Sequence, residues 1–177
     1  MRPILSVYMA IIVLAMGVSA NAQDHADHKK HMADLAGDGR HLVNFPPEMR
    51  QHTLANMRDH LQALSEILAA MSSANYAKAA RIANTRLGMD SPAAEGCKDE
   101  GASGAPQVSK PSSMDHQMSQ LMPEGMRKIG LEMHQSASDF AAQAAKASKT
   151  GNANAALASL ARVTRQCTAC HAAYKVP

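Results

Sequence analysis

Three residues near the C-terminus have the types and the spacing of a covalent haem anchor. Cys167, Cys170 and His171 stand in the order C-x-x-C-H. The two thiols can form thioethers with the vinyl groups of haem, and the adjacent imidazole can bind the iron. A disulfide or a C-x-x-C redox motif would use the same cysteines, but neither requires the histidine. The motif therefore predicts one covalent haem c, with His171 as the proximal ligand of the iron.

The late position of the motif limits where the second axial ligand can come from. Only six residues follow His171, too few to fold back over the opposite face of the haem. Met57 is the favoured distal ligand because it lies on an apolar helical stripe, whereas His60 lies on the flank of that stripe. A methionine on such a stripe is also an ordinary packing residue, so an open sixth site remains an alternative. All the upstream candidates are Met49, His52, Met57, His60, Met126, Met133 and His134.

The apolar residues repeat with gaps of three and four, which predicts four amphipathic helices to position these side chains. The helices cover residues 46–71, 76–87, 123–149 and 152–174, and residues 114–122 could form a further turn. Short connections within each pair favour an antiparallel four-helix bundle with the haem attached near the C-terminus, so the predicted fold class is all-α. Gly88 is expected to end the second helix in the left-handed conformation. The stripe of the first helix consists of Leu54, Met57, Leu61, Leu64, Leu68 and Met71.

The composition agrees with a helical haem protein and excludes other classes. The chain has no Trp, three Tyr and two Phe, but 13 Met, which suits helices better than sheets. A formal net charge of +3 without a long block of Lys and Arg argues against nucleic acid as a partner. No nucleophilic triad, paired carboxylates or phosphate loop stands out, so we do not expect an enzyme.

The first 22 residues read as a cleaved signal peptide. Arg2 precedes an apolar run over residues 4–18, and the small-residue triplet Ala20-Asn21-Ala22 follows it. The run is shorter than the roughly 20 residues of a membrane span, so we expect export to the periplasm without a membrane anchor. Residues 23–45 are predicted to be a mobile His-rich arm, and residues 46–177 the four-helix haem c domain. Within that domain, residues 89–113 are predicted to be a long flexible loop.

Two further features could bind metal or remain unpaired. Histidines of the arm and the Met and His residues of 114–122 could bind copper weakly, although a solvated arm and helix packing are the favoured explanations. Cys97, in the predicted loop, is left without a partner once the haem takes the other two cysteines. The arm histidines are His25, His28 and His31.

The C-terminal segment resembles that of the cytochrome c prime family, the class II c-type cytochromes. The likeness lies in CTACH on the last helix, followed by Tyr174 and Lys175, and it is specific over about residues 155–177. The resemblance implies a left-handed four-helix bundle, a frequent homodimer and a distal side formed by the first helix. Low-spin members place a methionine about four turns before the end of that helix, which corresponds to Met57. Many relatives carry an arginine where this chain has Thr53.

Three functions follow from these alternatives. Iron held by His171 and Met57 would be six-coordinate, which suits a single-electron carrier that meets redox partner proteins. An open sixth site would instead give a five-coordinate cytochrome c prime that binds NO or CO. Weak copper handling through the His and Met segments is the third. Arg50 or Arg58 could meet a haem propionate in the absence of the family's arginine.

Overall fold

The computed structural model describes residues 37–98 and 114–177. Residues from Arg40 to Pro177 form one unit, to which everything below refers, and the residues up to Gly39 form another. The predicted signal peptide, residues 23–36 of the predicted arm and residues 99–113 of the predicted loop lie outside the described residues. In the described part of the chain, no helix is long and apolar enough to cross a membrane.

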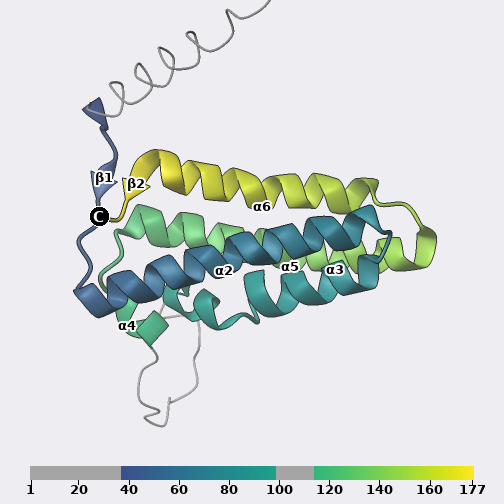
Figure 1. Cartoon of the computed structure of the whole chain (residues 1–177), viewed down its shortest axis with the longest axis horizontal. Helices are drawn as coiled ribbons and strands as arrows, with labels where there is room; N and C mark the ends of the chain where they lie inside the picture. Colours follow the sequence, from purple (N-terminus) through teal and green to yellow (C-terminus); the bar gives the residue numbers. More distant parts are fainter. Residues whose placement is uncertain (1–36, 99–113) are drawn as a thin grey trace, which may run out of the picture. The chain divides into compact units, whose positions relative to one another are not determined.

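The unit is mostly helical, as the apolar periodicity predicts, and its fold class is all-α. Helices α2 and α5 run in one direction, and α3 and α6 return in the other (Figure 1). The two strands contain two residues each. In chain order the elements are β1 (His41–Leu42), α2 (Pro47–Ser72), α3 (Tyr76–Ile82), the π-helix η2 (Ala83–Leu87), the 3-10 helix η3 (Pro92–Cys97), α4 (Met114–Ser119), α5 (Glu124–Thr150), α6 (Asn154–Ala173) and β2 (Tyr174–Lys175).

The ends of the helices follow from local chemistry. α2 begins at a proline, which needs no hydrogen-bond partner in the first turn, and Glu48 lies at the positive end of the helix dipole. The Asn75 side chain accepts a hydrogen bond from the backbone N–H of Lys78 at 3.1 Å and so caps α3. Gly151 ends α5 with φ 75°, a left-handed conformation that glycine adopts without strain.

The prediction for Gly88 is wrong. Its backbone is extended, with φ −77° and ψ −176°, because the helix widens into the π-helix η2, whose last turn closes with a hydrogen bond from the Gly88 N–H to the Ala83 carbonyl at 2.7 Å. A glycine is required for another reason. A Cβ at this position would lie 2.8 Å from Oγ of Ser138, which accepts a hydrogen bond from the Met89 N–H at 2.9 Å. Gly88 therefore lets the end of η2 approach α5 closely.

The main apolar core lies among α2, α3, η2, α5 and α6. Small residues dominate it, so the helices can approach one another closely around a few large side chains such as Phe140, which is fully buried. The core consists of Ala63, Ile67, Ala70, Met71, Ala79, Ala83, Leu87, Met133, Ala137, Phe140, Ala141, Ala144, Ala156, Leu160 and Val163.

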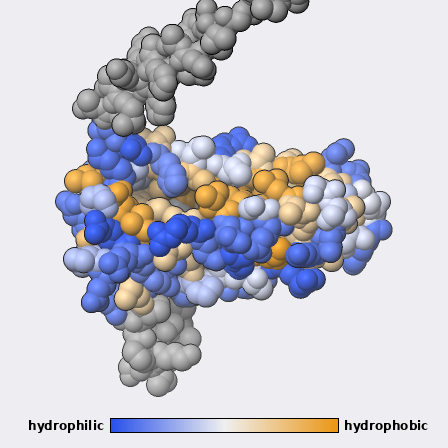
Figure 2. Space-filling view, viewed as in Figure 1, coloured by the Kyte–Doolittle hydropathy of each residue, from blue (hydrophilic) through white to orange (hydrophobic). Residues whose placement is uncertain are grey.

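The predicted stripe of the first helix is wrong in part, because α2 is rotated about its axis. Leu61 and Leu68 are 69% and 55% exposed, whereas Ala63 and Ile67 are fully buried. Ala63 and Ile67 lie in the core cluster that also contains residues of α3 and η2. The exposed leucines line an apolar groove with Leu160, and Figure 2 shows apolar surface between α2 and α6.

The end of the predicted arm is also different in the structure. β1 pairs with β2 in parallel, with His41 opposite Tyr174, and the Val43 N–H donates to the Lys175 carbonyl at 2.9 Å. Val43 and Phe45 are buried in a second apolar cluster beneath this pair. Residues 41–45 are therefore part of the folded unit, because the C-terminal tail offers them backbone partners. Part of the predicted flexible loop also has regular structure, because residues 92–97 form η3.

Candidate functional site

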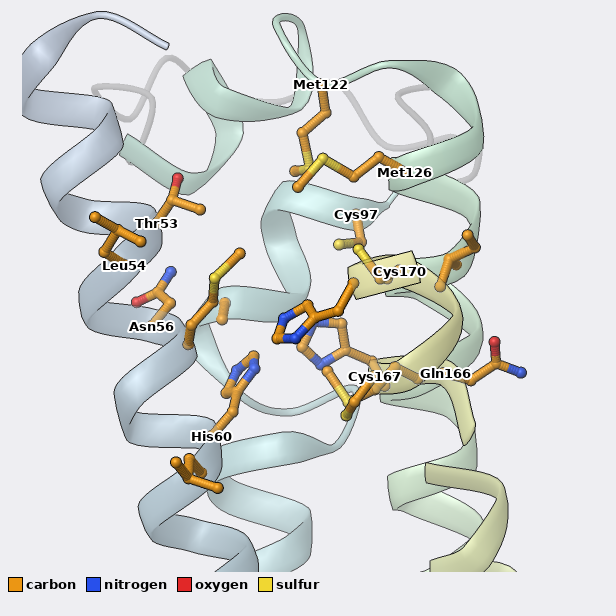
Figure 3. A pocket seen from close by; sticks show the side chains of 18 of the residues that line it. Thr53, Leu54, Asn56, His60, Cys97, Met122, Met126, Gln166, Cys167 and Cys170 are labelled. Atoms are coloured by element: carbon orange, nitrogen blue, oxygen red, sulfur yellow. The ribbon is translucent and has the colours of Figure 1, made fainter. Parts of the chain in front are cut away.

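One cavity brings most of the candidate residues together. Its volume is about 410 Å³, within the usual range of small-molecule and cofactor sites. Side chains of α2, η3, α4, α5 and α6 line it, and most of them are apolar (Figure 3). The lining residues that bear sulfur or imidazole are Met57, His60, Cys97, Met118, Met122, Met126, Met133, His134, Cys167, Cys170 and His171.

The C-x-x-C-H residues lie on the wall that α6 contributes. Cys167 and Cys170 are three residues apart, so both thiols emerge from one face of the helix, and both are half-buried. Burial raises the pKa of each thiol, so both stay protonated at neutral pH. Both cysteines are free of disulfides. His171 also lines the cavity, but its side chain is exposed, which places it at the opening.

The structure places some candidates for the distal ligand in the cavity and others outside it. Met57 is half-buried on α2 and lines the cavity, as do His60, Met126, Met133 and His134. Met49 and His52 lie elsewhere on α2. Met49 packs against the second apolar cluster, and Nε2 of His52 lies 2.7 Å from Oδ1 of Asp115. Of the candidates on α2, therefore, only Met57 and His60 line the cavity and remain possible distal ligands.

His60 lies in the cavity, although the sequence places it on the flank of α2. The rotation of α2 that exposes Leu61 turns His60 inward. Nε2 of His60 is buried without a hydrogen-bond partner, a situation that costs about 1–3 kcal/mol. Burial, followed by the nearby His134, lowers the pKa of His60 to about 4, so the ring is neutral at neutral pH.

His134 forms the wall behind His60. The two rings meet edge to face, with centroids 5.7 Å apart and planes at 83°. Nδ1 of His134 donates a hydrogen bond to the Leu87 carbonyl at 2.7 Å, which fixes the ring and leaves its lone pair on Nε2. Burial lowers the pKa of His134, while the hydrogen bond opposes that shift.

A polar cluster holds α4 against α2 beside the cavity. Asp115 is buried, and its Oδ1 accepts hydrogen bonds from Asn56 at 2.9 Å and pairs with His52 at 2.7 Å. One turn away, the Thr53 hydroxyl lies 2.7 Å from the sulfur of Met118 and donates to the Met49 carbonyl at 2.8 Å. Thr53 therefore helps to hold α4 against α2.

Cys97 is a cavity residue that the sequence does not reveal. It lies on η3 and is buried, and burial together with the nearby Cys170 raises the pKa of its thiol to about 11. A Cβ on Gly130 would lie 2.5 Å from the Cys97 sulfur, so the glycine makes room for the thiol against α5. The flanking residues have no apolar period that could have signalled this burial.

The arginines at the site differ in their partners. Arg58 is exposed and lines the cavity, so it could meet an acidic group of a bound molecule. Arg50 instead donates to a terminal oxygen of Pro177 at 3.2 Å, and Arg40 donates to the His171 carbonyl at 3.3 Å. Both contacts hold the C-terminal tail beside β1 and away from the cavity.

The cavity offers two thiols for covalent attachment, together with imidazole and thioether donors for a metal. Among the described residues, no group of three or more His, Cys, Asp or Glu side chains is arranged to hold a metal ion. An iron inside a porphyrin needs only one or two donors from the protein. No protein-family model, curated protein or solved structure matches this chain.

Proposed function

We propose that this chain is an exported monohaem c-type cytochrome of the periplasm that carries single electrons between redox partner proteins. In this proposal Cys167 and Cys170 bind the haem through thioethers, His171 is the proximal ligand of the iron, and Met57 is the distal ligand. Helices α2, α5 and α6 and the segment formed by α3 and η2 serve as an antiparallel four-helix bundle around the haem.

One observation carries the proposal. Met57 and the three motif residues are about 110 positions apart in the sequence, yet all four line the same cavity. The cavity has the donor chemistry that a haem c requires, and the unpaired Nε2 of His60 is a polar atom left for a bound group. The tail after His171 is paired with β1, which supports an upstream origin for the distal ligand.

The bound haem would supply a one-electron ferric–ferrous couple. The Met57 thioether is a soft donor that favours ferrous iron and so raises the reduction potential. The mostly apolar lining of the cavity would lower the local polarity around the haem, which also disfavours the more charged ferric state. Arg58, at the exposed edge of the cavity, can pair with a propionate. The exposed position of His171 leaves that side of the site near the surface, where a partner protein can approach.

Optical spectra of the haem-loaded protein test the role of Met57. We expect a low-spin spectrum in both oxidation states and a methionine-to-iron charge-transfer band in the ferric state. Met57→Ala should abolish that band, whereas Met126→Ala, which removes another thioether of the same cavity, should retain it. An unchanged band in Met57→Ala would eliminate Met57 as the ligand. A high-spin wild-type spectrum that shifts on addition of NO or CO would favour the gas-binding cytochrome c prime.

A further inference from the structure

The ligand set of the proposed electron carrier leaves one buried polar atom of the cavity without a partner. Among the described side chains, Nε2 of His60 is the only buried nitrogen or oxygen without a hydrogen-bond partner. Buried polar atoms are nearly always paired, and an exception indicates a missing partner. An apolar side chain would fill the same place on α2 without leaving an unpaired nitrogen. The ring therefore points to a partner that the chain itself does not supply.

His60 lies where it can face the same bound group as Met57. The two residues are three positions apart on α2, so they share one face of the helix, and both line the cavity. Figure 3 shows the His60 ring projecting from α2 into the cavity, with Cys167 and Cys170 on the opposite side. A haem attached to those cysteines would lie between them and His60.

The orientation of His60 is fixed without the use of Nε2. The ring packs edge to face with His134, and His134 is held by its hydrogen bond to the Leu87 carbonyl at 2.7 Å. The two cavity methionines of α5 give no comparable indication of a missing partner. Thioether sulfurs pack in apolar surroundings without a hydrogen bond, whereas an imidazole nitrogen with a free lone pair is a strong iron ligand.

We propose that His60 is a second distal ligand of the haem iron, which binds through Nε2 when the thioether of Met57 is absent or displaced. The inference rests on the proposed function, because it requires haem at Cys167 and Cys170. In the exchange an iron–sulfur bond breaks and an iron–nitrogen bond forms. The neutral imidazole supplies the electron pair of the new bond, and neither an electron nor a proton is transferred.

The exchange would give the protein two electronic states. Imidazole stabilises ferric iron better than a thioether does, so coordination by His60 and His171 should lower the reduction potential. The state with Met57 bound would accept electrons more readily. A change of ligand would therefore adjust the direction of electron flow through the same cavity.

The test uses the haem-loaded full chain with Met57→Ala alone and combined with His60→Ala. We expect the single variant to lose the charge-transfer band but to remain low-spin, with the electron paramagnetic resonance signature of two nitrogen ligands. The double variant should be high-spin, and added imidazole should return it to low-spin. Met57→Ala combined with His52→Ala is the matched control, because His52 is an imidazole of α2 outside the cavity, and it should behave like the single variant.

The single variant decides the inference even if the double variant does not fold. A high-spin Met57→Ala protein that carries covalent haem would overturn the role of His60 and leave the proposed function intact. A low-spin double variant would also overturn it, since another residue would then be the ligand. Absence of covalent haem from the wild-type protein would overturn the proposed function itself.

Discussion

Replacement of His60 by leucine should make the stability of the protein without haem less sensitive to acid. The pKa of His60 is about 4 in the folded protein and 6.5 in the unfolded chain, because burial disfavours the charged ring. Between these two values the unfolded chain binds a proton that the folded protein does not. The free energy of unfolding therefore falls as the pH decreases from 6.5 towards 4.

The size of the effect follows from the same pKa values. Between pH 7 and pH 5, His60 should lower the free energy of unfolding by about 2 kcal/mol. His60→Leu should remove this loss. At pH 7 the variant should also be more stable than the wild type by about 1–3 kcal/mol, because the unpaired Nε2 is gone.

Guanidinium unfolding followed by helical circular dichroism at the two pH values measures both effects. His134→Leu is the contrasting variant, because it also removes a buried histidine but breaks the hydrogen bond to the Leu87 carbonyl. It should therefore lose stability at pH 7, where His60→Leu gains it. Equal losses of stability between pH 7 and pH 5 in the wild type and in His60→Leu would refute the reasoning.

Three further predictions concern packing around the site. Phe140→Ala should lower the free energy of unfolding by about 3–5 kcal/mol because the ring is fully buried, whereas Leu157→Ala on the surface should change it by less than about 1 kcal/mol, both measured by chemical unfolding. Gly130→Ala should cost about 1–3 kcal/mol, because its Cβ would meet the Cys97 sulfur at 2.5 Å. Cys97→Ala in the same chain should restore most of that loss, and an unrelieved double variant would contradict the contact. The Cys97 thiol should react slowly with an alkylating reagent until the protein unfolds, since it is buried and its pKa is about 11; rapid labelling of the folded protein would contradict this.

The helices could be predicted because each carries its own signals. The apolar gaps of three and four define α2, α5 and α6. Prolines mark the starts of α2 and α5, Asn75 the start of α3, and Gly151 the end of α5. The C-x-x-C-H motif is equally local, because Cys167 and Cys170 lie about one turn apart on one helix. Such features depend on neighbours in the sequence, which the sequence displays directly.

The rotation of α2 could not be predicted in the same way. A stripe through Leu61 and Leu68 and a stripe through His60 and Ile67 differ by one residue, and both have helical periodicity. The choice depends on which face of α2 packs into the core with the other helices, and this is a tertiary relationship. The sequence therefore locates Met57 on the apolar stripe but places His60 only on its flank, whereas both residues line the cavity.

Long-range pairs account for the other differences. Strands β1 and β2 have two residues each, which is too short for an alternating pattern, and each exists because the other supplies backbone partners. Cys97 is buried because Gly130, on another helix, leaves space for its sulfur. Neither relationship produces a periodic signal around the residues involved.

The most direct test of the central claim is the haem content and optical spectrum of the chain produced with a c-type haem attachment system. We predict one haem that remains bound after denaturation and acid extraction, and low-spin spectra in the ferric and ferrous states. Replacement of Cys167 and Cys170 by alanine should abolish covalent retention. A wild-type protein that yields no covalently retained haem under these conditions would contradict the assignment of this chain as a c-type cytochrome.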